Sequence, residues 1–335
     1  MTSKLPGGTV AAVPGLDPRS YEPSKLHAPD AIWQEKNCYV DIWIEIIHCL
    51  GLPPEAAMGF TLAGDFEGDQ WTFFKPSHDE LRLLYGLDVQ ELTTWRPLLE
   101  QSIDFLAAGK LVSVESDSFW LPNTAATDYR KAHGKTTIVI NAIDLAAQRM
   151  CYFHSAGYHE MSGEDFVKTF RLDAGNDPEH LPLFAEYIRS DRVVRHSDAE
   201  LKAISADLLR KYVDRLPIDN PVVRFGDRVQ AEIPNLQARG LAYYHKWAFA
   251  TVRQLGAAME LGASNLRWLA PDQADFISAA EHLERISFNC KSLILKLARA
   301  VNSRKTPDLS ETCTGMSEDW RHAMELLRAW RARPR

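Results

Sequence analysis

The stretch that decides the fold is residues 37–50, NCYVDIWIEIIHCL. Its apolar residues recur at intervals of three and four, which predicts an amphipathic helix that begins at Cys38 and ends near Gly51. Asn37 is a suitable N-cap residue, so we expect Cys38 in the first helical turn. There the unpaired backbone N–H groups and the positive end of the helix dipole favour a thiolate over a thiol. The sequence therefore predicts that Cys38 is a nucleophile.

A histidine far downstream is the expected base. His133 precedes a strand-like stretch, residues 136–140 (TTIVI). A cysteine at a helix start, followed about a hundred residues later by a histidine at a strand start, is the chain order of papain-like folds. In those folds the two residues become neighbours only in space. A buried structural cysteine with an unrelated surface histidine would give the same order.

The composition excludes several classes of protein. The chain has 335 residues, of which 45% are hydrophobic and 25% charged, and this is typical of a soluble globular protein with room for two domains. The formal net charge of −7 argues against a nucleic-acid-binding protein, because counterion release needs a basic face. Residues 1–30 do not have the pattern of a secretory signal, and no apolar stretch approaches the roughly 20 residues that span a bilayer. We therefore expect a cytoplasmic protein without membrane association.

The cysteines and histidines do not form a metal-binding pattern. The five cysteines are scattered and never occur as Cys-x-x-Cys, which indicates reduced thiols rather than disulfides or a cysteine zinc site. Residues 154–160 (HSAGYHE) contain two histidines five apart with a glycine between them. This differs from the helical His-Glu-x-x-His arrangement of zinc enzymes. We expect no bound metal.

Pattern changes divide the chain into four segments. These are a flexible or surface-draped arm at 1–30, an α+β catalytic domain at 31–175, a connector at 176–234 and an all-α helical bundle at 235–335. In the second segment the patterns predict helices over 77–85, 95–108 and 162–170, and strands over 111–115, 136–140 and 149–153. The connector and bundle are predicted to contain helices over 180–190, 197–214, 235–269, 271–303 and 317–332. The predicted class is α+β.

Several motifs resemble a bacterial family of unknown function. They are residues 37–41 (NCYVD), 65–75 (DFEGDQWTFFK), 84–86 (LYG), 152–154 (YFH), 157–158 (GY), 248–251 (AFAT), 253–254 (RQ) and 268–269 (WL). The resemblance covers about residues 30 to 300. This family is similar, more distantly, to the N-terminal domain of the butirosin biosynthesis acyltransferase, which moves an acyl group from a carrier-protein thioester to an amine through a papain-like cysteine. It is also associated with amino acid:carrier-protein ligases.

The resemblance implies a papain-like cysteine acyltransferase or peptidase-like fold for the α+β domain. It implies that Cys38 is the nucleophile and His133 the base. In related peptidase-like domains an Asp follows the second strand after the histidine, and here His154 stands at that point. The other candidates for this third, orienting member are Asn141, Asp144 and Asp117. Of these, Asp144 is expected in the connection between two strands.

The implied reaction is acyl transfer from the phosphopantetheine arm of an acyl or aminoacyl carrier protein. The Cys38 thiolate would attack the thioester, and a small-molecule or peptide amine would then attack the acyl-cysteine. No bound cofactor is expected, because the phosphopantetheine arm belongs to the donor. The Cys38 backbone N–H and the side chain of Gln34 or Asn37 are the expected oxyanion donors.

Two sets of side chains are candidates for substrate binding. The first is acidic and lies beside an aromatic residue: Asp65, Glu67, Asp69 and Trp71. These acids would hold the ammonium group of an aminoacyl donor, or else form a solvated loop. In the predicted helix 235–269, Arg253 and Glu260 are seven residues apart and share a face. Arg253 would bind the phosphopantetheine phosphate or a substrate carboxylate, or else form a structural pair with Glu260.

Three functions therefore fit the sequence. The first is a carrier-protein-dependent acyltransferase. The second is a cysteine amidase or peptidase on the same residues, with water or a peptide in the role of the amine. The third is a non-catalytic protein that holds the loaded carrier arm, and it predicts an ordinary pKa for Cys38.

Overall fold

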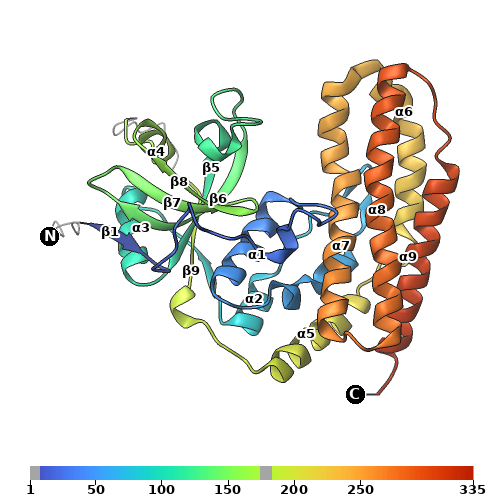
Figure 1. The fold of residues 1–335 in the computed structure, drawn as a ribbon, viewed down its shortest axis with the longest axis horizontal. Helices are drawn as coiled ribbons and strands as arrows, with labels where there is room; N and C mark the ends of the chain where they lie inside the picture. Colours follow the sequence, from blue (N-terminus) through green and yellow to red (C-terminus); the bar gives the residue numbers. More distant parts are fainter. Residues whose placement is uncertain (1–7, 174–182, 335) are drawn as a thin grey trace. The chain divides into compact units, whose positions relative to one another are not determined.

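The computed structural model, drawn in Figure 1, describes residues 8–173 and 183–334. The chain forms two compact units and passes between them several times. Unit 1 lies within residues 1–27, 38–54 and 77–196, and unit 2 within residues 28–37, 55–76 and 197–335. Unit 1 contains a large sheet, and the part of unit 2 from residue 198 onward is all-helical. The predicted α+β class is confirmed.

Unit 1 is built on an antiparallel sheet with the strand order β4-β9-β5-β6-β7-β8, to which β1 adds by pairing with β6. The strands are β1 (Thr9–Ala11), β4 (Val89–Glu91), β5 (Leu111–Asp117), β6 (Lys135–Asp144), β7 (Arg149–His154), β8 (Gly157–Ser162) and β9 (Ala185–Ile188). The three predicted strands correspond to β5, β6 and β7. Their β-branched residues suit a pleated surface that is buried, and the three lie side by side.

In the described part of unit 1, the helices are α1 (Cys38–Cys49), α2 (His78–Tyr85), α3 (Leu98–Ala107) and α4 (Glu164–Thr169). Short 3-10 turns are Lys25–His27, Pro54–Ala63, Ser118–Trp120, Pro122–Thr124 and Ser190–Arg192. Helix α1 packs against β6, β7 and β8, and α3 packs against β1, β5 and β6. Apolar residues of α3 and α4 form one core with strands β5 to β8, including the fully buried Ile138, Tyr152 and Phe166. As predicted, the first helix begins at Cys38.

The N-terminal segment is tied to α1 by a buried polar network. His27 Nε2 lies 3.0 Å from Asp41 Oδ1, and His27 Nδ1 contacts Glu45. Tyr21 donates its hydroxyl to Glu45 Oε2 at 2.5 Å. Burial alone would lower the pKa of His27, but hydrogen bonds to the two carboxylates outweigh burial and raise it. We expected a flexible or surface-draped arm over 1–30, whereas residues 8–27 contain β1 and this network.

One element predicted as a helix is a strand. The pattern predicted a helix over 180–190, but Ala185–Ile188 is β9, which pairs with β4 on one side and β5 on the other. Residues 180–182 of that prediction lie outside the described residues. Two neighbouring strands supply ladder partners for its backbone, and such tertiary pairing overrides a weak local preference.

Unit 2 contains five long helices: α5 (Asp198–Val213), α6 (Pro221–Ala250), α7 (Val252–Leu269), α8 (Ala274–Ser303) and α9 (Ser310–Arg331). The predictions for α5, α8 and α9 are confirmed, but the predicted helix over 235–269 is two helices that meet at Thr251. The first of them begins at Pro221, inside the predicted connector, because Asn220 accepts a hydrogen bond from the Val222 N–H and proline suits the first helical position. Helix α6 kinks at Gly240, where φ is 79°. No described helix has the length and apolarity needed to cross a bilayer.

Two early segments belong to unit 2. Residues 55–76 include the short hairpin of β2 (Phe66–Glu67) and β3 (Gln70–Trp71). In residues 28–37, the Trp33 indole donates to Ser287 Oγ at 3.0 Å. A Cβ at Gly256 would lie 2.6 Å from the Trp33 ring, so only glycine lets this ring lie against α7.

Candidate functional site

Cys38 occupies the first turn of α1 and is partly exposed. Burial raises the pKa of its thiol above the ordinary value, and the nearby Asp41 acts in the same direction. Hydrogen bonds from Thr136 and from the backbone N–H groups of Tyr39 and Cys38 oppose this rise without cancelling it. The net direction is opposite to the predicted depressed pKa. Cys38 is therefore a thiol at neutral pH in this structure.

Thr136 connects Cys38 to a buried hydrogen-bonded chain. Thr136 Oγ1 lies 2.9 Å from His154 Nε2, and Asn123 Nδ2 lies 2.7 Å from His154 Nδ1. Tyr152 donates its hydroxyl to Asn123 Oδ1 at 2.9 Å. Because the Asn123 amide donates to Nδ1, we assign the ring proton to Nε2, from which it is donated to Thr136. The Thr136 hydroxyl hydrogen is then free to point toward the sulfur of Cys38.

His154 is the neutral centre of this chain. It is the last residue of β7, the point in the sequence where a third catalytic member was expected. Burial, with a smaller effect from His159, lowers its pKa to about 4. Its partners are Thr136 and Asn123, so it orients the hydroxyl beside Cys38 rather than the imidazole of His133.

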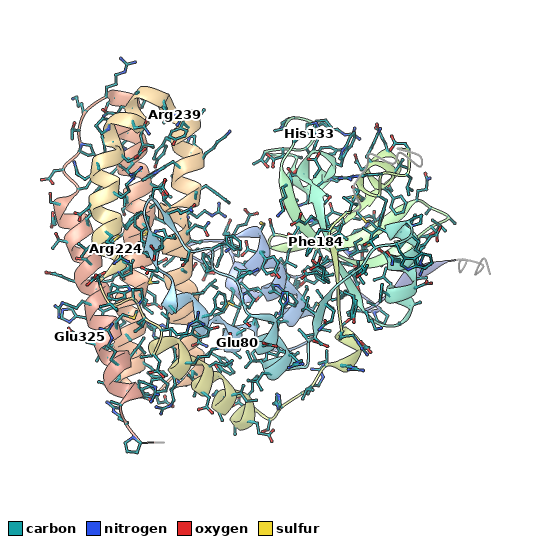
Figure 2. All side chains as sticks on the ribbon, turned by 180° about the vertical axis from the view of Figure 1, so that it is seen from behind. Glu80, His133, Phe184, Arg224, Arg239 and Glu325 are labelled. Atoms are coloured by element: carbon teal, nitrogen blue, oxygen red, sulfur yellow. The ribbon has the colours of Figure 1, made fainter. Side chains whose placement is uncertain are left out.

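His133 forms a separate pair with Asp117. Figure 2 labels His133 at the periphery of unit 1, where 70% of its side chain is exposed. Its Nδ1 lies 2.6 Å from Asp117 Oδ2, and its ring stacks on Phe119 with centroids 4.3 Å apart. Asp117 Oδ1 also accepts the backbone N–H groups of Phe119 and Gly134, each at 3.1 Å. Of the four candidates for a third member, Asp117 is therefore the one hydrogen-bonded to His133.

This carboxylate is held in its charged form. Partial burial alone would raise the pKa of Asp117, but the hydrogen bond from His133 and those from Phe119 and Gly134 outweigh it and lower the pKa. A carboxylate fixed by two backbone donors orients the imidazole through Nδ1. The Nε2 of His133 is then the atom that can accept a proton.

The pair lies in the wall of a pocket of about 770 Å³ in unit 1. The lining residues are Glu115, Ser116, Asp117, Trp120, His133, Gly134, Lys135, Lys168, Thr169, Arg171, Asp173, Leu183 and Phe184. Side chains of both charges are among them. This volume lies within the range of small-molecule sites.

The sheet register relates Cys38 to this pocket. Thr136, the hydrogen-bond partner of Cys38, directly follows the pocket residues Gly134 and Lys135, and it is paired across the sheet with Ser116. Ser116 Oγ is buried, and it has no hydrogen-bond partner among the residues that the structure describes. His133 itself is not among the largest influences on the pKa of Cys38. The direct Cys38–His133 contact of the sequence analysis stays a prediction.

Asn141 and Asp144 hold other parts of unit 1 together. Asn141 donates to the carbonyl of Val13 at 3.0 Å and to the hydroxyl of Tyr158 at 2.9 Å. Asp144, expected in a connection, is the last residue of β6, and it accepts the Ala147 N–H at 3.0 Å. These contacts tie the two residues to the N-terminal segment and to the turn after β6.

The two candidate oxyanion donors have partners within residues 28–37 and 55–76. Asn37 Nδ2 donates to the carbonyl of Phe74 at 3.0 Å, and Gln34 Nε2 donates to the carbonyl of Pro29 at 3.2 Å. Their role as oxyanion donors stays a prediction.

The acidic set near the hairpin is divided between structural and exposed residues. Asp65 forms an ion pair with Arg224 of α6, and the Trp71 ring lies 5.7 Å from the ring of Phe225. These contacts fasten the hairpin to α6. Glu67, at the end of β2, and Asp69, in the turn of the hairpin, are exposed.

Arg253 and Glu260 both hold residues 28–37, and they do so through separate contacts. Arg253 donates to the carbonyl of Glu35 at 2.6 Å. The Glu260 carboxylate accepts the Trp33 N–H at 3.1 Å and lies 3.4 Å from the ammonium group of the buried Lys36. The contacts of both side chains are thus structural, and the substrate-binding role predicted for them stays a prediction.

Sequence reasoning missed Thr136, Asn123 and Ser116. The only available signal was a polar residue beside a run of strand-forming residues, and this pattern is common. Across residues 8–173 and 183–334, the structure brings no three His, Cys, Asp or Glu side chains into a group that would hold a metal ion.

The family comparison divides the chain into two parts. The DUF1839 N-terminal domain matches residues 22–190, and the DUF1839 C-terminal domain matches residues 198–329. The first match ends at residue 190 and the second begins with α5 at residue 198, whereas the predicted boundaries after the arm lie at 175 and 234. No curated protein matches the chain in sequence. Because the two matches cover most of its length, the chain belongs to the DUF1839 family, as the resemblance to a family of unknown function implied.

Proposed function

We propose that this protein is a cysteine-dependent acyltransferase. Cys38 takes an acyl or aminoacyl group from the phosphopantetheine thioester of a carrier protein and passes it to an amine. The observation that carries the proposal is that the Cys38 sulfur, in the first turn of α1, has Thr136 as a hydrogen-bond donor, which His154 in turn holds. A cysteine at the start of a helix that packs on an antiparallel sheet supports a papain-like arrangement.

The first step exchanges one thioester for another. The sulfur of Cys38 forms a bond to the acyl carbon, and the bond from that carbon to the pantetheine sulfur breaks. The proton that leaves Cys38 ends on the released thiol, so no net acid or base is consumed. Thr136 and the N–H of Tyr39 stabilise the charge that develops on the Cys38 sulfur. A thiol leaving group needs little acid assistance, so the raised thiol pKa slows this step without preventing it.

The second step transfers the acyl group to the amine. The nitrogen attacks the acyl-cysteine, the carbon–sulfur bond breaks, and one amine proton must leave. His133 Nε2 accepts this proton, and Asp117 stabilises the imidazolium that forms. The proton finally returns to the sulfur of Cys38, which restores the thiol.

The raised pKa of Cys38 favours a second candidate function. A protein that only holds a loaded carrier arm needs no thiolate, and burial beside Asp41 keeps this cysteine protonated. In that function Cys38 is never acylated. The two candidate functions therefore differ in whether Cys38 forms a covalent acyl adduct, which changes the mass of the protein.

The test is to incubate the protein with an aminoacyl thioester of N-acetylcysteamine and measure its intact mass. We expect one acyl group on the wild type, located at Cys38 by peptide mass spectrometry and lost in Cys38→Ser. Cys49→Ser is the matched control, because Cys49 belongs to the same helix and burial raises its pKa to about 12. Added amine should release the group as an amide.

Each other outcome selects a different function. Release of the acyl group by water at the same rate with and without amine would identify the amidase or peptidase. A wild type that stays unlabelled while it binds the thioester would establish the non-catalytic holder. Labelling at Cys49 in place of Cys38 would contradict both enzymatic readings.

A further inference from the structure

The pocket of unit 1 presents charges of both signs. Its cationic side chains are Lys135, Lys168 and Arg171, and its carboxylates are Glu115, Asp117 and Asp173. Lys135 lies 2.5 Å from Glu115, and Lys168 pairs with Asp173. A ligand with a single charge would pair with one sign and leave the opposite partners uncompensated. A ligand with both charges can pair its cationic group with a carboxylate of the pocket and its anionic group with a lysine or arginine, so that neither sign is left uncompensated.

One polar atom of the pocket wall has no partner. Ser116 Oγ is buried without a hydrogen bond to any described residue. A buried polar atom without a hydrogen bond destabilises the folded state unless something satisfies it. Ser116 is paired with Thr136 in the β5–β6 register, so the part of the pocket wall at Ser116 lies close to the partner of Cys38.

The pocket must also hold a group that removes a proton from the amine. An ammonium group cannot attack an acyl-cysteine, so the acceptor must lose a proton inside the site. His133 lines the pocket, and Asp117 occupies its Nδ1, which leaves Nε2 for this task. Apolar side chains, Trp120, Leu183 and Phe184, complete the wall and suit a short carbon chain.

We propose that this pocket binds the amine acceptor, and that the acceptor is a small molecule carrying both an amine and an anionic group, a carboxylate or a phosphate. The inference rests on the proposed function and names its second substrate by class. The amine lies toward His133 and Ser116, and the anionic group lies toward Lys168 and Arg171.

The test measures binding without any transfer reaction. Protein labelled with ¹³C in its histidine rings is titrated with β-alanine and with phosphoethanolamine, and the ring signals are followed by NMR. Ethanolamine and propionate serve as probes with one charge each. We expect the His133 signal, assigned with His133→Gln, to move at concentrations at least tenfold lower for a zwitterion, a difference of about 1.4 kcal/mol. The zwitterion that acts at the lower concentration identifies the anionic group.

The chain offers a matched control. His282 of unit 2 also has its Nδ1 2.6 Å from an aspartate, Asp319, and it does not line this pocket. Its signal should stay in position. Ser116→Ala and Lys168→Met should each weaken binding severalfold while the other histidine signals are unchanged. Equal shifts at His282, or equal response to the singly charged probes, would overturn the proposal.

The two proposals fail separately. If zwitterions bind at His133 but Cys38 is never acylated, the transferase is wrong and the binding site stands. If Cys38 is acylated but His133 responds to neither zwitterion, the transferase stands and this pocket is not the acceptor site.

Discussion

Two buried histidines of unit 1 have opposite surroundings. His27 lies between two carboxylates, Asp41 and Glu45, and its pKa is raised. His154 lies between a threonine hydroxyl and the Asn123 amide, and its pKa falls to about 4. Burial lowers the pKa in both cases, so the charge of the partners decides the outcome. A buried histidine is a cation beside acids and a neutral hydrogen-bonding ring beside amides.

A partner of each histidine also acts on the pKa of Cys38. Asp41, which pairs with His27, raises the pKa of Cys38, whereas Thr136, which pairs with His154, lowers it. The reactivity of the thiol therefore depends on the balance between the two networks. The following variants change one side of that balance at a time.

The largest effect is expected for His27→Ala. Removing the imidazole leaves Asp41 and Glu45 buried without their cationic partner, and such a loss typically costs about 3–5 kcal/mol. The measurement is the free energy of unfolding in urea at neutral pH. A loss below about 1 kcal/mol would show that these carboxylates are not held by a charged histidine.

His154→Gln should change how stability depends on acid. The folded pKa of His154 is below its unfolded value of about 6.5, so its contribution is present above pH 6.5 and lost as pH falls toward 4. The wild type should lose about 3 kcal/mol over this range, and His154→Gln should not. For His27 the sign is reversed, because a raised pKa gives stability below pH 6.5 that is lost as pH rises. Urea unfolding at a series of pH values checks both, and identical curves for the variant and the wild type would contradict the first.

Thr136→Val should lower the reactivity of Cys38. The variant removes the hydroxyl that donates to the sulfur, a hydrogen bond worth about 1 kcal/mol, so alkylation by iodoacetamide should slow about three- to tenfold at fixed pH. Thr136→Ser keeps the hydroxyl and should stay near the wild-type rate. Cys49 in the same sample serves as the internal reference. An unchanged Cys38 rate in the valine variant would remove Thr136 from the site.

The smallest effect is expected for His133→Ala on stability. Its ion pair with Asp117 is exposed, and pairs of this kind contribute about 1 kcal/mol or less. Urea unfolding should therefore barely change, while the amine-dependent release of the acyl group slows. A stability loss as large as that of His27→Ala would mean that His133 is structural.

The sequence predicts what depends on local spacing. The periodicity of residues 37–50 was sufficient to predict that α1 begins at Cys38, because a helix start is a local property. The partner of Cys38 depends on how β6 lies beside α1. No pattern in the sequence around Thr136 indicates its hydrogen bond to Cys38. Of the four candidates for a third member, strand register brings Asp117 to His133, since β5 and β6 pair Asp117 with Lys135 next to the loop of His133.

Features that depend on distant partners were not predicted. Strand β9 was predicted as a helix because its partners, β4 and β5, are distant in the chain. The contacts of Glu260 with residues 32 to 36, more than two hundred positions earlier, were also not predicted from its helix face. Such long-range partners are invisible to a pattern of neighbouring residues.

The early segment of unit 2 has a consequence for synthesis on the ribosome. Ile32 donates its N–H to Glu260 at 2.7 Å across a sequence separation of 228 residues. At about 5–20 residues per second, residues 28–37 wait roughly 10 to 45 seconds before their binding surface on α7 has been made. During that time Ser287, which accepts the indole N–H of Trp33, has not been made, although most of unit 1 has already been translated. A C-terminal fragment that starts at residue 198 would leave the Glu260 carboxylate without Ile32, Trp33 and Lys36.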